Sequence, residues 1–128
     1  MPDAQTVHRR LLDLYPDVLA GRMDQALALI DPDVVDHRGG TDGDHHGRDA
    51  WRAKWERLGD GFHDLSATVE QTVASGDTSV NRYTLRGTYT GSGRSYEIGG
   101  LDMIRVRDGR VVEHWAFGDR ELMRQQLS

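Results

Sequence analysis

The sequence contains no cysteine, which excludes disulfide bonds, thiolate metal sites and cysteine nucleophiles. It has no apolar run close to the ~20 residues that a membrane helix requires, so we expect no membrane contact. Its first residues, MPDAQTVHRR, lack the apolar segment of a signal peptide. Lys and Arg number only 16 against 21 Asp and Glu, a net charge of −5, so we expect no nucleic-acid partner. These absences favour a cytoplasmic protein.

The chain is long enough for one domain with its own core, spanning residues 1–128. Apolar residues recur at helical spacing in the first half, whereas from Leu65 onward they alternate with polar residues, as in strands. The pattern predicts helices at 6–21 with a kink at Pro16, at 23–30, 49–58 and 120–127, and strands at 31–38, 65–75, 80–90, 96–106 and 111–117. Helices first and hairpins afterwards predict an α+β fold, in which about three N-terminal helices pack on a curved antiparallel sheet and enclose a pocket.

The segment from Gly99 to Asp119, GGLDMIRVRDGRVVEHWAFGD, predicts a β-hairpin. Asp108-Gly109 is a dipeptide typical of the type I′ turn, and it places Val106 opposite Val111, Ile104 opposite Glu113 and Asp102 opposite Trp115. Residues two apart share a face. The face of Asp102 would carry Ile98, Ile104, Val106, Val111, Glu113, Trp115, Phe117 and, if the strand continues, Asp119. The opposite face would carry Leu101, Met103, Arg105, Val112, His114 and Ala116.

Asp102 would thus lie among Ile and Trp side chains. A buried carboxylate must find partners or keep its proton, because burial raises its pKa. The chemical interpretation is a tuned acid, and the structural one is a carboxylate held by a neighbouring Arg or Tyr. Asp119, which precedes Arg120-Glu121, fits the N-cap of the last helix, and capping does not exclude catalysis.

Three segments resemble the SnoaL-like polyketide cyclases of the nuclear transport factor 2-like (NTF2-like) superfamily. They are DPDVVDH at 31–37, VASGDTSVNRYTLRGTYTG at 73–91 and GGLDMIRVRDGRVVEHW at 99–115. The resemblance implies a cone-shaped α+β fold and an intramolecular aldol ring closure without metal or cofactor. It also implies an acid–base carboxylate at the end of the last strand, where Asp119 stands, and an assisting histidine. His37 and His114 both fit, and the predicted register favours His37. Tyr89 replaces a histidine that the family often has in its GTHxG segment.

The chain also resembles ketosteroid isomerase, an enzyme that uses a tyrosine, a base aspartate and a protonated aspartate. By position, Tyr15, Asp36 and Asp102 correspond to these three groups. The resemblance implies that Asp36 abstracts a proton next to a carbonyl, while Tyr15 and a neutral Asp102 donate to the enolate oxygen. Both resemblances imply enolate formation in an apolar pocket.

Five aromatic residues are candidates for the substrate-binding wall, and core packing is the alternative for each of them: Trp115, Phe117, Tyr89, Trp51 and Trp55. The cluster DHRGGTDGDHH at 36–46 holds possible metal ligands, but its spacing matches no HExxH motif or calcium loop. We therefore assign no metal site and expect a polar flap over the pocket there.

These observations favour a small cofactor-independent enzyme acting on a hydrophobic carbonyl compound by cyclisation or isomerisation, with Asp119, Asp102, Asp36, Tyr15 and His37 as its catalytic groups. One alternative is hydrolysis of an epoxide by an activated water, and another is a non-catalytic binder of a hydrophobic ligand or a dimeric scaffold. The sheet face with Leu101, Met103, Val112 and Ala116 is too apolar to remain wet, so we expect a homodimer through it, with Arg105 and His114 at the interface.

Overall fold

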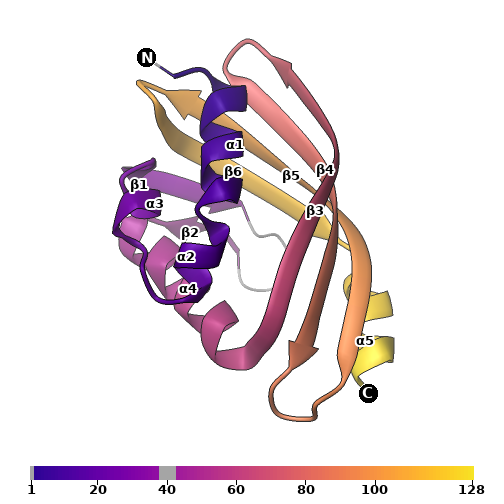
Figure 1. The fold of residues 1–128 in the computed structure, drawn as a ribbon. Coiled ribbons are helices and arrows are strands. Elements are labelled where there is room, and N and C mark those ends of the chain that lie inside the picture. The colour runs from indigo at the N-terminus through magenta and orange to yellow at the C-terminus, as the bar shows by residue number, and fades with distance from the viewer. Residues whose placement is uncertain (1, 38–42) are drawn as a thin grey trace.

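Six strands form one curved sheet in the order β2-β1-β6-β5-β4-β3 in the computed structural model, which describes residues 2–37 and 43–128 (Figure 1). The strands are β1 (Ile30–His37), β2 (His45–His46), β3 (Phe62–Ser75), β4 (Thr78–Tyr89), β5 (Ser95–Arg107) and β6 (Arg110–Gly118). Consecutive hairpins join β3 to β6, as the alternating pattern predicts. β1 runs parallel to β6, so the sheet is mixed at this edge rather than antiparallel throughout.

Helices cover one face of the sheet, which we call the inner face (Figure 1). They are α1 (Ala4–Asp13), α2 (Tyr15–Leu19), α3 (Asp24–Leu27) and α4 (Arg48–Gly61), and α5 (Arg120–Leu127) ends the chain. Asp3 accepts a hydrogen bond from the Thr6 backbone N–H at 2.8 Å and caps α1. Pro16 lies in the first turn of α2, where a missing N–H is tolerated. It therefore divides the helix expected at 6–21 into α1 and α2.

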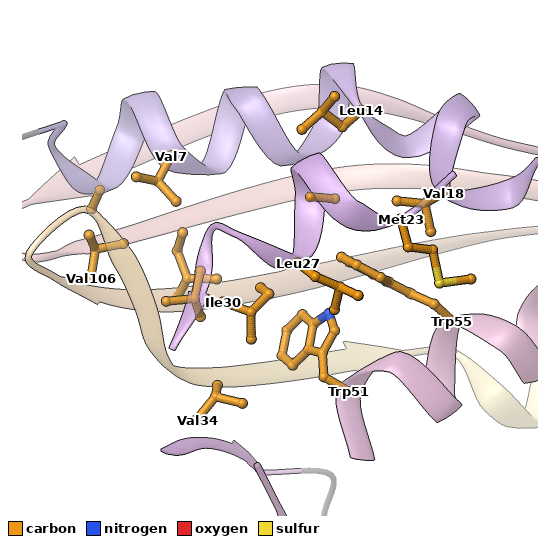
Figure 2. Close-up of a cluster of buried hydrophobic side chains, with 14 residues drawn as sticks. Val7, Leu14, Val18, Met23, Leu27, Ile30, Val34, Trp51, Trp55 and Val106 are labelled. Atoms are coloured by element: carbon orange, nitrogen blue, oxygen red, sulfur yellow. The ribbon is translucent and has the colours of Figure 1, made fainter. Parts of the chain in front are cut away.

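The hydrophobic core lies between these helices and the inner face (Figure 2). Its fully buried members include Val7 and Val18 from the helices, and Ile30, Val34, Ile104 and Val111 from the strands. The two α4 tryptophans close the core with their rings edge to face, 5.7 Å apart. The apolar residues of the helices and those of the strands therefore pack against each other in one layer. None of the helices in the described part of the chain is long and apolar enough to span a membrane.

The β5–β6 hairpin turns where the sequence predicts, but its register changes after two residue pairs. Asp108 and Gly109 have φ of 53° and 74°, and Val106 pairs with Val111 as expected. A β-bulge follows, because Arg105 pairs with Glu113 and leaves Val112 as an extra residue.

The predicted pairing beyond the bulge was therefore wrong. Ile104 pairs with His114 instead of Glu113, and Asp102 pairs with Ala116 instead of Trp115. A shift of one residue exchanges the two faces of a strand. His114 and Ala116 consequently share the inner face with Asp102. Glu113, Trp115 and Phe117 lie on the opposite, outer face.

Candidate active site

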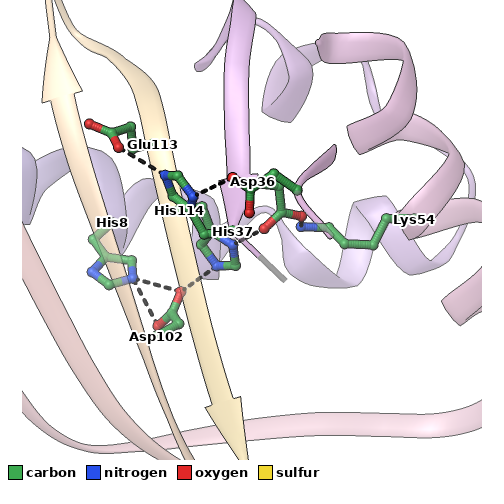
Figure 3. Close-up of polar contacts among 8 residues, drawn as sticks. His8, Asp36, His37, Lys54, Asp102, Glu113 and His114 are labelled. Carbon is green, nitrogen blue, oxygen red and sulfur yellow. Dashed lines mark hydrogen bonds and ion pairs between the residues drawn. The ribbon is translucent and has the colours of Figure 1, made fainter. Parts of the chain in front are cut away.

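Six side chains from six different elements, all but one of them labelled in Figure 3, form one chain of hydrogen bonds and ion pairs on the inner face. In order they are Lys54 of α4, Asp36 of β1, His114 of β6, Asp102 of β5, His8 of α1 and Ser79 of β4. We call this set the acid–imidazole chain. Acidic and basic groups alternate along it, so a proton can be accepted or donated at several points.

His114 is at the centre of the acid–imidazole chain and lies between two carboxylates. Its Nδ1 is 2.8 Å from Asp36 Oδ1, and its Nε2 is 3.3 Å from Asp102 Oδ2. An imidazole donates from both nitrogens only when each carries a proton, and an ionised carboxylate only accepts. The geometry therefore suits a doubly protonated ring. The edge of this ring contacts Trp51, with the centroids 4.9 Å apart.

Asp102 lies between two imidazoles. His8 Nε2 is 3.0 Å from each of its carboxylate oxygens. Burial raises the pKa of Asp102, but the hydrogen bonds from His114 and His8 outweigh this effect and hold the pKa at about 2. The side chain keeps 22 % of its surface exposed, more than either imidazole beside it. Asp102 is therefore an ionised carboxylate and the most accessible of these three groups.

Asp36 is the other carboxylate of the chain. Its side chain is 6 % exposed and accepts from Lys54 Nζ at 2.9 Å as well as from His114. Burial raises its pKa, but the hydrogen bond from His114 and the charge of Lys54 together lower it well below the usual range. Lys54 Nζ also lies over the Trp51 ring, 3.3 Å from its centroid. Asp36 is thus a fixed negative charge behind His114.

Tyr83 lies within electrostatic range of Asp102, and Tyr15 lies within electrostatic range of Tyr83. Burial and the negative charge of Asp102 raise the pKa of Tyr83 to about 12. Burial, with a smaller effect of Tyr96, raises that of Tyr15 to about 12 as well. Tyr83 pairs with Gly100 across β4 and β5, and a Cβ at Gly100 would lie 2.8 Å from the Tyr83 ring. Both hydroxyls therefore keep their protons at neutral pH and are hydrogen-bond donors.

The structure brings together some of the predicted catalytic residues and separates others. Asp36 and Asp102 are joined through His114, and Tyr15 lies within electrostatic range of Tyr83, the neighbour of Asp102. A neutral Asp102 that donates to an enolate, as in ketosteroid isomerase, stays a prediction, and the hydrogen bonds that lower the pKa of Asp102 favour the ionised carboxylate instead. The sequence-based preference for His37 over His114 rested on the register, which was wrong.

His37 belongs to a separate outer-face cluster. Its Nε2 is 2.9 Å from Glu113 (Figure 3). Its Nδ1 is 3.1 Å from Asp44, and its ring stacks on Trp115 with the centroids 4.7 Å apart. The hydrogen bond with Glu113 is the largest of the effects that raise the pKa of His37. His37 is therefore held on the outer face, away from Asp102.

Asp119 is also apart from the acid–imidazole chain. It is exposed, and its Oδ1 accepts from the Leu122 backbone N–H at 2.9 Å, which caps α5. The prediction that Asp119 caps the last helix is thus confirmed, and its catalytic role stays a prediction.

The five predicted substrate-binding aromatics lie in three different places. Trp115 and Phe117 are on the outer face, where Phe117 is 65 % exposed. Tyr89 is half-exposed at the end of β4, next to Phe62. Trp51 and Trp55 are core residues of α4, and Trp51 also contacts the acid–imidazole chain at His114 and Lys54. Its indole N–H is buried and has no hydrogen-bond partner among the described residues.

The expected flap at 36–46 falls partly outside the described residues, including Asp42. Within the described part, His45 and His46 form β2 and pair with β1. No group of three or more possible metal ligands occurs in residues 2–37 and 43–128. A depression of about 450 Å³ lies at the far end of β4 and β5, lined by residues that include Arg86, Tyr96 and Gln126. It is not adjacent to Asp102 along either strand.

Sequence reasoning missed His8, Ser79 and Lys54. Two of them carried a detectable signal, because each is a polar residue within an apolar helical stripe. His8 is spaced i, i+3, i+7 with Leu11 and Tyr15, and Lys54 lies between Trp51 and Trp55. Ser79 carried no comparable signal, since serine is common on alternating strands.

Comparisons with known proteins agree with this fold. A family model described as SnoaL-like polyketide cyclase matches residues 6–127. Wild-type IdmH of Streptomyces antibioticus, a candidate polyketide cyclase, is 36% identical with a TM-score of 0.78, over 94% of this chain and 97% of that chain. TsrD of Streptomyces laurentii is 25% identical with a TM-score of 0.78, over 97% and 93%.

An NTF2-like protein of unknown function from Burkholderia pseudomallei has a TM-score of 0.85 at 20% identity, over 100% of this chain and 99% of that chain. At this identity the likeness shows the fold alone. A search among curated proteins found no match.

Proposed function

The chain belongs to the SnoaL-like polyketide cyclase family, and we propose that it forms the enolate of an apolar carbonyl substrate by acid–base chemistry, without a cofactor, and directs that enolate to ring closure or isomerisation. The family and its structural neighbours support a cyclase or isomerase role in general. The observation that carries the finer proposal is the position of His114 between two carboxylates.

The His114–Asp102 contact is the weakest link of the acid–imidazole chain. It measures 3.3 Å, whereas the other links measure 2.8 to 3.0 Å. A substrate carbonyl oxygen can take the His114 Nε2–H in place of Asp102. Asp36 then still holds the ring through Nδ1, and its negative charge stabilises the imidazolium.

Substrate binding would thereby strengthen Asp102 as a base. Burial is the largest influence on its pKa and raises it, and the hydrogen bond from His114 is the largest of the opposing effects. When His114 donates to the substrate instead, one of the effects that lower the pKa of Asp102 is lost, and the pKa rises because burial is less opposed. Asp102 therefore gains basicity only when a carbonyl group occupies the site.

The steps balance in protons and charge. Asp102 takes a proton from the carbon next to the carbonyl, and His114 donates a hydrogen bond to the enolate oxygen. In ring closure the enolate carbon attacks a second carbonyl, and the alkoxide that forms takes the proton from the imidazolium. When the product leaves, Asp102 passes the proton that it took to His114 Nε2 across their 3.3 Å contact, which restores the ionised carboxylate and the imidazolium. In isomerisation Asp102 returns its proton to a different carbon. Tyr15 and Tyr83, which keep their protons, can donate to the same oxygens.

Proton exchange tests the common first step without knowledge of the natural substrate. The protein is incubated with 2-tetralone, an apolar bicyclic ketone, in D₂O, and NMR follows the loss of the α-proton signal. We expect exchange faster than in buffer. Asp102→Asn and His114→Gln should each reduce it by about 10² or more, the range of general acid–base catalysis.

Matched variants separate the proposal from its alternatives. Glu113→Gln changes the neighbour of His114 on the outer face and should leave exchange unchanged. Asp119→Asn tests the role that the family resemblance implies for that residue. If the ketone shifts the resonances of the Asp102 region but no exchange occurs, the protein is a binder of hydrophobic ligands and not an enolising enzyme.

We also propose a homodimer through the outer face. The bulge removes His114 and Ala116 from the expected interface and adds Trp115 and Phe117. Phe117 and Leu101 pair across β5 and β6, and their side chains are 65 % and 43 % exposed. Exposed apolar side chains in one patch are typical of an association surface.

A further inference from the structure

The two imidazoles beside Asp102 differ in the partner of Nδ1, the ring nitrogen that does not contact Asp102. The Nδ1 of His114 faces the carboxylate of Asp36 at 2.8 Å. The Nδ1 of His8 faces the hydroxyl of Ser79, also at 2.8 Å. A carboxylate without a proton only accepts hydrogen bonds, whereas a hydroxyl can donate or accept. The two rings are therefore not equivalent in the protonation states that their neighbours permit.

A neutral His8 satisfies every contact at this position. Ser79 Oγ–H donates to Nδ1, and Nε2–H donates to the two oxygens of Asp102, each 3.0 Å away. The same neutral state at His114 would leave one nitrogen lone pair facing a carboxylate. Hydrogen-bond satisfaction thus permits a single proton on His8, whereas it requires two on His114.

Burial strengthens this distinction. His8 is 4 % exposed and Ser79 is fully buried. A charge on His8 would lose its hydration, and its nearest carboxylate is already in contact with His114. Ser79 is also too buried to be a nucleophile, so a hydrolase-type role for the Ser79–His8–Asp102 set is not supported.

Building on the proposed function, we propose that Ser79 is a positioning residue that keeps His8 neutral and holds its Nε2–H toward both oxygens of Asp102. His8 then orients the carboxylate in its ionised and protonated states without adding a positive charge beside it. A second imidazolium there would stabilise the ionised carboxylate further and weaken it as a base. Proton donation and carboxylate orientation are thereby divided between His114 and His8.

Nitrogen NMR tests the inference without substrate. Long-range ¹H–¹⁵N correlation spectra of the ¹⁵N-histidine-labelled protein at pH 7 distinguish protonated from unprotonated ring nitrogens. We expect His8 to show a protonated Nε2 and an unprotonated, hydrogen-bonded Nδ1, and His114 to show two protonated nitrogens.

Ser79→Ala should move the His8 Nδ1 resonance to the position of an imine nitrogen without a donor. It should also slow 2-tetralone exchange by about fivefold, the rate equivalent of one neutral hydrogen bond. Ser79→Thr retains the hydroxyl and should restore both signals. Thr84→Ala removes a hydroxyl from the outer face of the same strand and should change neither.

Two protonated nitrogens on His8 in the unmodified protein would overturn the inference. So would a Ser79→Ala protein that loses thermal stability but keeps the His8 resonances and the exchange rate, since Ser79 would then be a packing residue only. The expected histidine pattern without any ketone exchange would support the role of Ser79 and refute the proposed function instead.

Discussion

Replacing Asp102 with Asn should destabilise the protein in a pH-dependent way. The pKa of Asp102 is lowered from 3.8 to about 2 in the folded protein. This lowering corresponds to about 2 kcal/mol of native-state stabilisation, because one pKa unit is worth about 1.4 kcal/mol. The side chain is 22 % exposed, so solvent screening reduces this figure little.

The sign of the pH dependence follows from the direction of the shift. A folded-state pKa below the unfolded one adds stability that is present above the unfolded pKa and lost as the pH falls through the folded one. The contribution of Asp102 is therefore complete at pH 7, and about half of it remains at pH 3. We expect Asp102→Asn to cost about 2 kcal/mol at pH 7 and about 1 kcal/mol at pH 3.

Urea unfolding followed by tryptophan fluorescence measures both values. Subtracting the unfolding free energy of the variant from that of the unmodified protein cancels the contributions of acids that titrate alike in both. Asp119→Asn is the matched control, because Asn and Asp are similar N-caps and the variant should change the unfolding free energy little. An equal cost of Asp102→Asn at pH 7 and pH 3, or a more stable variant, would refute the pairing of Asp102 with its two imidazoles.

Three further predictions concern other parts of the molecule. Glu113→Gln should lower the pKa of His37, measured by NMR titration, because Glu113 is the largest cause of its raised value. The stability from this pair is complete below the ordinary His37 pKa of 6.5 and is lost as the pH rises through the raised one. Gly100→Ala should cost about 1–3 kcal/mol in urea unfolding, because its Cβ would crowd a tyrosine ring, whereas Gly99→Ala, with open space around it, should be nearly neutral. Phe117→Asp should yield a monomer in sedimentation equilibrium if the outer face forms the homodimer; an unmodified protein that is already monomeric would contradict it.

Local signals in the sequence were sufficient for most of the fold. Helical spacing located α1, α2 and α4, and alternation located the long strands. Asp108-Gly109 adopts the positive φ values that its turn type requires. The parallel pairing of β1 with β6 joins strands that are distant in the sequence, so no local pattern could indicate it.

The candidate site was predicted less well, because it depends on contacts between elements. Asp102 was identified as an acid that a sheet would bury and Asp36 through the resemblance to ketosteroid isomerase, and both belong to the acid–imidazole chain. Their imidazole and lysine partners come from other strands and helices. Treating every polar residue in an apolar helical stripe as a candidate would have identified His8 and Lys54.

The bulge at Val112 connects the two faces of the sheet. One extra residue in β6 turns His114 toward Asp36 and Asp102, and the same rotation moves Trp115 to the outer face. Without the bulge, Glu113 would lie on the same sheet face as Asp102, and like charges would replace the carboxylate–imidazole alternation. The outer face would then present His114 and Ala116 in place of two aromatic rings. The proposed proton chemistry and the proposed dimer surface therefore both depend on the position of this single residue.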